Sequence, residues 1–368
     1  MKKNDEQIGQ VELRNVSKSY GSVKALISAN LKVRRDESVA ILGPSGSGKS
    51  TLLGILAGFI EADGGDVLFG TSLVNTVPTH KRDVGMVFQR YALFPNQTVF
   101  ENLAFPLMIR KRPEDEIKRQ VEKTLDLVGL SQLADRYPGA LSGGQAQRVA
   151  LARSLVFTPR VLLMDEPLGA LDRQLRTGLQ VEMRRIQQAA GVPSIYVTHD
   201  QEEAMHLADR IILIHEGRIV ADSSPQELYQ YPRSVWSANF LGSACIFRID
   251  ETKVQSDKTI VVSGEGASGT ATDTYMLGAN STPLGLVLRP EDGRLINGQD
   301  GADSGKGVIV EGEVILTTFL GARQSILIRG ANGKSLNIEI SGRDIAPEIG
   351  ARVQCFWPTK VAVVAEYE

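Results

Sequence analysis

The chain has 368 residues, of which 42% are hydrophobic and 23% are charged, a composition typical of globular proteins. This length is sufficient for two or three domains. The formal net charge of -2 argues against a globally basic surface, so we expect no nucleic acid partner. The start of the chain lacks a secretory pattern, and no apolar run approaches the ~20 residues that a membrane-spanning helix requires.

The two cysteines, Cys245 and Cys355, are far apart in the sequence and lack the spacing of metal ligands. Free thiols in a reducing cytoplasm are the favoured interpretation. A disulfide between them stays open as the alternative.

The first predicted elements are two strands. Residues 11–16 alternate apolar and polar side chains, as a half-buried strand does, and residues 26–33 continue a strand-like pattern. Between them lies Tyr20, whose ring could stack on a nucleotide base or simply pack against its neighbours.

Residues 43–51 match the G-x-x-x-x-G-K-[ST] pattern of phosphate-binding loops. A short apolar strand at 38–42 precedes them and an apolar helix at 52–60 follows, which is the context that the motif requires. The glycines allow backbone N–H groups to converge on an anion, and the helix adds its positive N-terminal end. We expect Lys49 to reach the β- and γ-phosphates of a nucleotide and Ser50 to ligate Mg²⁺. The predicted nucleotide-binding residues here are Gly43, Pro44, Ser45, Gly46, Ser47, Gly48, Lys49, Ser50 and Thr51.

The next segments carry weaker signals. Residues 83–89 predict a short strand that ends at Gln89, an amide that could ligate Mg²⁺, orient water or only end the strand. The aromatic and proline-rich residues 91–107 predict an irregular surface for a partner, with a local core as an equal alternative. Residues 114–128 have helical periodicity and predict a helix that ends at Gly129.

A second glycine turn, L-S-G-G-Q at 141–145, precedes a helical pattern at 149–155. A glycine turn at a helix N-terminus is a second potential anion site. The chain therefore has two phosphate-binding devices but only one loop that carries a lysine.

Residues 161–164 are apolar and are followed by Asp165 and Glu166. As a buried strand, this segment would deliver both acids to the carboxyl edge of a parallel sheet, where ligands bind in such folds. We expect Asp165 to hold Mg²⁺ and Glu166 to accept a proton from the attacking water. Residues 194–200 predict another strand that ends near His199, which could contact a γ-phosphate or be a turn residue.

Together, these motifs resemble the ATP-binding subunit of ATP-binding-cassette transporters from about residue 11 to residue 241. L-S-G-G-Q is the most family-specific of them. The resemblance implies that Tyr20 contacts adenine and that His199 contacts the γ-phosphate. It also implies that Gln89 and Asp172, which lies in the loop after the acid pair, belong to the nucleotide-binding residues.

The resemblance also implies a head-to-tail homodimer, in which the phosphate loop of one subunit faces the signature turn of the other. The signature residues that would bind the partner's ATP are Ser142, Gly143, Gly144 and Gln145. Gln89 would couple the site to a membrane subunit, and residues 91–107 would dock it. Residues that differ from those frequent in the family, none of them catalytic, are Gln97, Pro106, Ala146 and Gly169.

After residue 242 the pattern changes to short strands separated by Gly-, Ser- and Asp-rich turns. The strand candidates are residues 259–262, 284–288, 308–315, 325–328, 336–340 and 353–356. They predict a small all-β, OB-like barrel or a sandwich. The tripeptide 289–291, R-P-E, resembles the regulatory domain of importers of maltose, polyamines, ferric iron and sulfate. Its role would be either ligand sensing or passive dimerisation.

We therefore expect an α/β P-loop ATPase core at residues 1–240, with a helical subdomain at about 90–158, followed by a β-barrel regulatory domain at 241–368. The predicted function is an ATP-hydrolysing subunit that energises solute import. It would be peripheral to the cytoplasmic face of the inner membrane, with two transmembrane permease subunits and, indirectly, a substrate-binding protein. Residues 94–95 and 100–102 slightly favour a polyamine, ferric iron or small-anion substrate over a sugar. The alternative is a soluble cassette ATPase outside transport, and a binding module that uses ATP only as a signal is a third possibility.

The expected site has three catalytic residues, namely Lys49, Glu166 and His199. The expected Mg²⁺ ligands are Ser50, Gln89 and Asp165.

Overall fold

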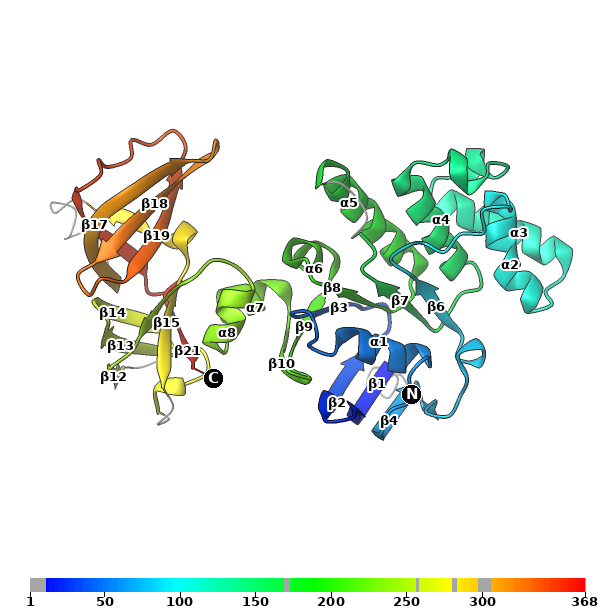
Figure 1. Ribbon diagram of the computed structural model, residues 1–368, viewed down its shortest axis with the longest axis horizontal. Coiled ribbons are helices and arrows are strands. Elements are labelled where there is room, and N and C mark those ends of the chain that lie inside the picture. Colours follow the sequence, from blue (N-terminus) through cyan, green and yellow to red (C-terminus); the bar gives the residue numbers. More distant parts are fainter. Residues whose placement is uncertain (1–10, 169–172, 256–257, 280–282, 297–305, 368) are drawn as a thin grey trace, which may run out of the picture. The chain divides into compact units, whose positions relative to one another are not determined.

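The computed structural model describes residues 11–168, 173–255, 258–279, 283–296 and 306–367. Gly169 and Asp172 lie outside the described residues. Contacts divide the chain into two compact units, Met1–Pro225 and Gln226–Glu368, whose elements are labelled in Figure 1. The division falls earlier in the chain than the boundary expected at residue 240, because residues 226–240 group with the second unit.

The first unit is built on two sheets (Figure 1). The antiparallel sheet has four strands in the order β2-β1-β4-β5, with bounds β1 Val11–Tyr20, β2 Val23–Val33, β4 Gly64–Phe69 and β5 Ser72–Leu73. The second sheet has six strands in the order β10-β9-β3-β8-β7-β6. Its strands are β3 Ser38–Leu42, β6 Val84–Val87, β7 Val161–Asp165, β8 Ser194–Thr198, β9 Arg210–His215 and β10 Arg218–Ser223. All its ladders are parallel except that between β9 and β10.

Helices connect the parallel strands, which is the α/β pattern. They are α1 Lys49–Ala57 after β3, then α2 Val99–Ile109, α3 Glu114–Leu127 and α4 Gly143–Leu155 between β6 and β7, α5 Arg173–Ala190 after β7 and α6 Gln201–Leu207 after β8. The short 3-10 turns are η1 Thr79–Lys81, η2 Ser131–Leu133 and η3 Pro138–Ala140. Because parallel strands share a carboxyl edge, the segments that follow β3, β6, β7 and β8 meet at one edge of the sheet.

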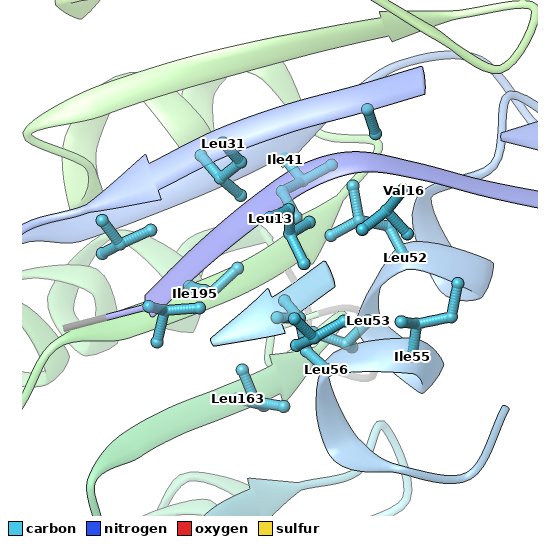
Figure 2. Close-up of a cluster of buried hydrophobic side chains, with 14 of the residues drawn as sticks. Leu13, Val16, Leu31, Ile41, Leu52, Leu53, Ile55, Leu56, Leu163 and Ile195 are labelled. Atoms are coloured by element: carbon cyan, nitrogen blue, oxygen red, sulfur yellow. The ribbon is translucent and has the colours of Figure 1, made fainter. Parts of the chain in front are cut away.

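The core of this unit lies between the two sheets around α1 (Figure 2). Leu13 and Leu31 come from the antiparallel sheet, Ile41 comes from β3, and Leu52 and Leu56 come from α1. Each fully buried side chain of this size contributes about 1.5–3 kcal/mol through the removal of apolar surface from water. Sheets cover α1 on both sides, and this explains why its sequence is apolar all round instead of amphipathic.

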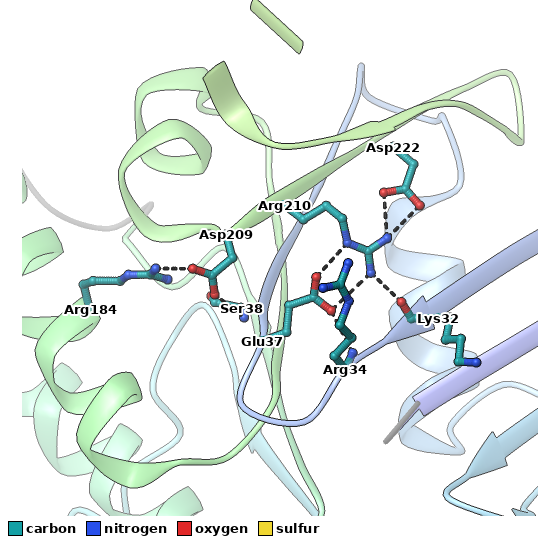
Figure 3. A network of polar contacts seen from close by, with 8 residues as sticks. All are labelled: Lys32, Arg34, Glu37, Ser38, Arg184, Asp209, Arg210 and Asp222. Carbon is teal, nitrogen blue, oxygen red and sulfur yellow. Dashed lines mark hydrogen bonds and ion pairs between the residues drawn. The ribbon is translucent and has the colours of Figure 1, made fainter. Parts of the chain in front are cut away.

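A network of ion pairs and hydrogen bonds lies at the N-terminal ends of β3 and β9 (Figure 3). The Arg210 guanidinium at the start of β9 donates from Nε to Glu37 Oε1 over 2.8 Å and from Nη1 to both carboxylate oxygens of Asp222 over 2.7 Å. The backbone N–H of Ser38 donates to Asp209 over 2.9 Å, and Arg184 forms an ion pair with that carboxylate. These contacts fix the N-terminal ends of β3 and β9, away from the phosphate loop.

The segment expected to be irregular at 91–107 is partly helical, so that prediction was wrong for α2. Thr98 caps this helix: its hydroxyl accepts from the backbone N–H of Glu101, and the Glu101 carboxylate accepts from the N–H of Thr98. The helix contains Pro106 and packs on α3 and α4, which together form the expected helical layer. Tertiary packing of this kind overrides the low helix propensity of one proline.

The second unit begins with α7 Pro225–Gln230 and α8 Val235–Phe240 and continues as one branched all-β sheet of 11 strands. Its main path has the order β11-β15-β21-β14-β17-β18-β19. The strands are β11 Cys245–Arg248, β12 Glu251–Val254, β13 Thr259–Gly264, β14 Ala267–Thr272, β15 Leu284–Leu288, β16 Arg294–Ile296, β17 Gly307–Phe319, β18 Arg323–Gly330, β19 Ser335–Ser341, β20 Arg352–Pro358 and β21 Val363–Glu366, with 3-10 turns η4 Leu277–Ala279 and η5 Pro290–Asp292.

All six strand candidates of the C-terminal third are strands, but the sequence missed five others. Strand β14 is one of these five, yet it is a central strand that pairs with β13, β17 and β21. At Gly269, a Cβ would lie 2.0 Å from the carbonyl oxygen of Gly307, so this glycine allows two strands to approach closely.

Both cysteines are free thiols that are buried in the core of this unit. Burial raises the pKa of the Cys355 thiol to about 12, which makes it an unreactive apolar side chain. Within the described ranges, no helix is long and apolar enough to cross a bilayer.

Candidate active site

The loop between β3 and α1 is shaped by glycines that have no room for a side chain. A Cβ at Gly43 would lie 2.2 Å from the carbonyl oxygen of Ile214, and a Cβ at Gly48 would lie 2.2 Å from that of Ala25. Gly48 also caps α1 with a φ of 107°, a conformation that other residues rarely adopt. The loop is therefore pressed against β2 and β9, and its N–H groups are available to an anion at the N-terminus of α1.

Lys49 is held inside this loop. Its ammonium donates to the carbonyl oxygens of Gly43 and Pro44, each over 2.8 Å, and the side chain is buried. Burial lowers the pKa of Lys49, and the nearby carboxylates of Glu166 and Asp165 oppose that shift. A buried ammonium that has only neutral hydrogen-bond acceptors is a strong partner for a phosphate.

The other predicted residues of the loop differ in exposure. The hydroxyl of Ser47 is buried and has no partner among the described residues, whereas Ser45, Gly46 and Ser50 are exposed. Pro44 and Thr51 are half-buried. The Tyr20 ring is 50% exposed and its only ring contact within the described residues is with the Lys18 ammonium, 5.6 Å from the ring centroid. A flat aromatic surface is thus open to stacking near β1's end.

Asp165 and Glu166 stand at the carboxyl end of β7. Asp165 is the last residue of the strand, and burial raises the pKa of its carboxyl, with Glu166 adding to the shift and Lys49 opposing it. Glu166 lies just beyond the strand with a φ of 44°, and its N–H donates to the carbonyl oxygen of Val197 over 2.9 Å. A non-glycine residue in the left-handed region is strained, and such residues cluster at functional sites.

The structure brings three predicted residues into direct contact. Gln89 Nε2 donates to Glu166 Oε2 over 2.8 Å, and His199 Nδ1 lies 2.8 Å from Glu166 Oε1. The three side chains follow β6, β7 and β8, neighbouring strands of one sheet. Both carboxylate oxygens of Glu166 are therefore engaged, which fixes the orientation of the one group placed to act as a base.

The signature turn forms the N-terminus of α4. The Ser142 hydroxyl accepts from the N–H of Gln145 over 3.3 Å, and the Gln145 side chain accepts from the N–H of Ser142 over 2.9 Å. Ser142 and Gly143 are exposed, and a Cβ at Gly144 would meet Leu179 at 3.0 Å. Within the described part of one chain, no side-chain hydrogen bond joins this turn to the phosphate loop.

Sequence reasoning missed Gln147, which is 1% exposed. Its Nε2 donates to the carbonyl oxygen of Pro167 over 2.7 Å and lies 3.0 Å from the sulfur of Met183. Its position was a usable signal, because Gln147 precedes the buried Leu151 by one helical turn and is thus a polar residue on the apolar face of α4.

The residues present fit a nucleoside triphosphate, because the loop has a buried ammonium and glycines that no side chain can replace. Among the described residues, no three His, Cys, Asp or Glu side chains form a metal site. The donors available are Ser50, Gln89 and Asp165, and one carboxylate with neutral oxygens is the donor set of a Mg²⁺ that also binds phosphates.

Comparison with known proteins agrees with this geometry. Residues 26–169 match the family model described as ABC transporter. The spermidine/putrescine import ATP-binding protein PotA of Clostridium acetobutylicum is 41% identical over 326 residues, which cover 88% of each chain. The PotA protein of Aggregatibacter actinomycetemcomitans is 41% identical over 353 residues, which cover 94% of each chain.

Solved structures also match more than half of the chain. The structure of cbiO1 from Clostridium perfringens, part of the ABC transporter complex cbiONQ, has a TM-score of 0.56 and 30% identity, covering 60% of this chain and 90% of that one. A dimeric post-hydrolysis state of the ATP-binding cassette MJ0796 with ADP and Pi has a TM-score of 0.51 and 33% identity, covering 58% and 98%.

The fold and the site define a P-loop ATPase of the cassette type. The chain belongs to the ABC transporter ATP-binding family, in which it is an ATP-binding subunit that hydrolyses ATP. The resemblance found in the sequence is thus confirmed, and these relatives do not favour a soluble cassette ATPase outside transport.

The second unit has a hollow of about 880 Å³ lined by residues of β16, β17, β18 and β20. Its charged lining residues are Glu311, Glu313, Arg329 and Arg352. In the register of the sheet, Glu313 lies between Arg329 of β18 and Arg352 of β20. The lining of the hollow thus has charges of both signs.

Proposed function

We propose that this chain is the ATP-hydrolysing subunit of a polyamine importer. One observation carries the proposal: relatives named as spermidine/putrescine import ATP-binding proteins are similar over up to 94% of both chains, a range that includes the second unit. Cassette motifs are common to many ABC ATPases, so similarity that continues beyond them is the informative part. Polyamine is accordingly favoured over the ferric iron, small-anion and sugar substrates considered from the sequence.

In the proposed mechanism, Lys49 and the N–H groups of residues 43–51 hold the triphosphate. Glu166 takes a proton from the attacking water, and its two hydrogen bonds with Gln89 and His199 keep the carboxylate in place. The His199 side chain is 64% exposed, and while its Nδ1 stays with Glu166, its other ring nitrogen would contact a γ-phosphate. Tyr20 would stack on the adenine.

Ser50, Gln89 and Asp165 would hold Mg²⁺. When bound, this ion neutralises charge that develops on the phosphates. In this proposal Gln89 has two partners, the ion and Glu166, and so it would join metal binding to the placement of the base.

We further propose that two copies assemble head to tail, with Ser142, Gly143, Gly144 and Gln145 completing the partner's nucleotide site. Two observations support this: the signature turn is exposed, and its side-chain hydrogen bonds are internal. Residues 91–107 would dock a permease subunit, and Gln89 would couple the nucleotide site to it. The complex would contain two permease subunits at the cytoplasmic face of the membrane, with a substrate-binding protein outside. Asp172, outside the described residues, would belong to the nucleotide site.

The residues after 240 would form a regulatory module. Its hollow between Arg329 and Arg352 is consistent with ligand sensing, and dimerisation is the alternative role for the same unit.

The test is to co-purify the full chain with its native permease subunits and binding protein, reconstitute the complex in vesicles, and measure ATP turnover with candidate solutes. We expect spermidine or putrescine to stimulate turnover several-fold, with ferric iron, sulfate and maltose as matched controls. Stimulation by one of the controls and not by a polyamine would overturn the substrate assignment.

A further inference from the structure

Gln147 joins α4 to the residue that follows the catalytic glutamate. We propose that Gln147 is a positioning residue for ATP hydrolysis: its amide fixes the Pro167 carbonyl and thereby holds Glu166 in its strained conformation. The proposal deepens the proposed function and rests on the role of Glu166 as the base.

The contact is buried and directional. Gln147 is 1% exposed and its Nε2 donates over 2.7 Å to the carbonyl oxygen of Pro167. Its Oε1 is buried and has no partner among the described residues. A buried amide oxygen without a partner costs free energy, and a flipped amide would place this oxygen against the Pro167 carbonyl. The side chain therefore keeps the orientation that donates to Pro167, at the expense of its own acceptor.

The hydrogen bond from Gln147 restrains the backbone next to Glu166, which has a strained conformation. Glu166 has a φ of 44°, and a non-glycine residue in this region is strained and must be held by its surroundings. The N–H of Glu166 is fixed to Val197 on one side, and the carbonyl of the next residue is fixed to Gln147 on the other. Without the second bond, the carboxylate could leave its place between Gln89 and His199.

The same helix begins at the signature turn. Gln147 lies five residues after Ser142 on α4, one helix that is continuous from Gly143 to Leu155. A rigid displacement of α4 would therefore move the Pro167 carbonyl together with the turn. If Ser142 binds the partner subunit's nucleotide, Gln147 makes the base of one site responsive to the nucleotide in the other.

The test is the steady-state ATPase activity of the full-length chain with Gln147→Met, which keeps the volume of the side chain and removes the donor. We expect kcat to fall about tenfold, with KM and the Kd for ATP within twofold of the parent. Ser194→Ala is the matched control, because it removes a buried hydrogen bond of 3.1 Å to Ser38 at the far ends of β3 and β8. It should lower Tm to a similar extent and leave kcat unchanged.

A double-mutant cycle separates positioning from general destabilisation. Glu166→Gln alone should slow hydrolysis at least ~10²-fold, and a full rate there would refute the base itself, independently of Gln147. If Gln147 acts through Glu166, then Gln147→Met should cause no further loss in the Glu166→Gln background. An additional tenfold loss, or a parent kcat in Gln147→Met, would overturn the proposal. Should the methionine variant not fold, Gln147→Asn, whose shorter amide cannot reach Pro167, takes its place in the cycle.

Discussion

Asp165 illustrates how function and stability oppose each other at single residues. Its carboxyl ends a buried strand beside a second carboxylate, so the folded protein prefers it protonated and its pKa is raised. A raised folded-state pKa means that the charge destabilises the fold: the cost is absent below the unfolded pKa, grows between the unfolded and the folded pKa, and is fully present above the folded value. An ammonium at Lys49 and, in the proposal, Mg²⁺ offset this cost in the working site.

We therefore expect Asp165→Asn to raise the free energy of unfolding at pH 7 in the absence of nucleotide, because the variant buries no charge at this position. The gain should shrink as the pH is lowered through the folded-state pKa of the Asp165 carboxyl and should vanish below its unfolded-state pKa, where the parent side chain is neutral in both states. Urea unfolding across this pH range measures the effect, and the same variant should lose its Mg²⁺-dependent ATPase activity. A gain that is independent of pH would show that charge burial is not its cause.

The contacts among Gln89, Glu166 and His199 could not be predicted from the sequence. The motifs predicted Gln89, Glu166 and His199 as separate strand-end residues, because each follows an apolar run. Their mutual 2.8 Å contacts depend on the strand order β8-β7-β6, which no local pattern encodes. The left-handed conformation of Glu166 is likewise a product of tertiary contacts, since glutamate has no preference for it.

At the scale of elements, α2 depends on one buried amide in its first turn. Asn102 is fully buried and its Nδ2 donates to the carbonyl oxygens of Phe94, Gln97 and Thr98 over 2.9–3.2 Å, while its Oδ1 accepts from the N–H of Phe94 over 2.9 Å. The Asn102 side chain thus ties the segment around Phe94, which precedes the helix, to the first turn of α2.

Replacing Asn102 with alanine leaves several buried backbone groups without partners. We expect Asn102→Ala to lower the free energy of unfolding by about 2–3 kcal/mol, because each orphaned buried group costs about 1–3 kcal/mol and water can satisfy some of them. Gln97→Ala is the control of opposite sign, because the buried Gln97 Oε1 has no partner among the described residues and its removal should be neutral or slightly stabilising. Chemical denaturation of both variants checks this, and a neutral Asn102→Ala would contradict it.

Pattern strength explains which elements the sequence predicted. Long periodic segments such as α3, and apolar strands such as β7, have signals of their own and were found. Helix α2 was missed because prolines and aromatics obscure its period, and the exposed strand β12 was missed because no residue of E-T-K-V is buried. Helix α2 packs on α3 and α4, and β12 pairs with β13, so both elements depend on contacts with neighbouring elements.

At the scale of the whole molecule, one chain contains a phosphate loop and a signature turn that no side-chain hydrogen bond joins within its described residues. Lys49 is buried and bound to carbonyls, whereas Ser142 is exposed at the end of a 13-residue helix. In the proposed head-to-tail arrangement, a nucleotide held by both would lie between two copies, and each copy would supply one half of each site.

Mixed dimers test this arrangement directly. Ser142→Arg places a large cation where the partner's phosphates would lie, so homodimers of this variant should lose ATPase activity while the monomer still binds nucleotide. Homodimers of Lys49→Ala should also be inactive. A dimer of one Ser142→Arg chain with one Lys49→Ala chain has a single intact site, made of the phosphate loop of the first and the signature turn of the second. If one site can turn over alone, differentially tagged heterodimers should recover up to about half of the parent rate. Full inactivity of the heterodimer, with each chain folded and dimeric, would contradict the shared site.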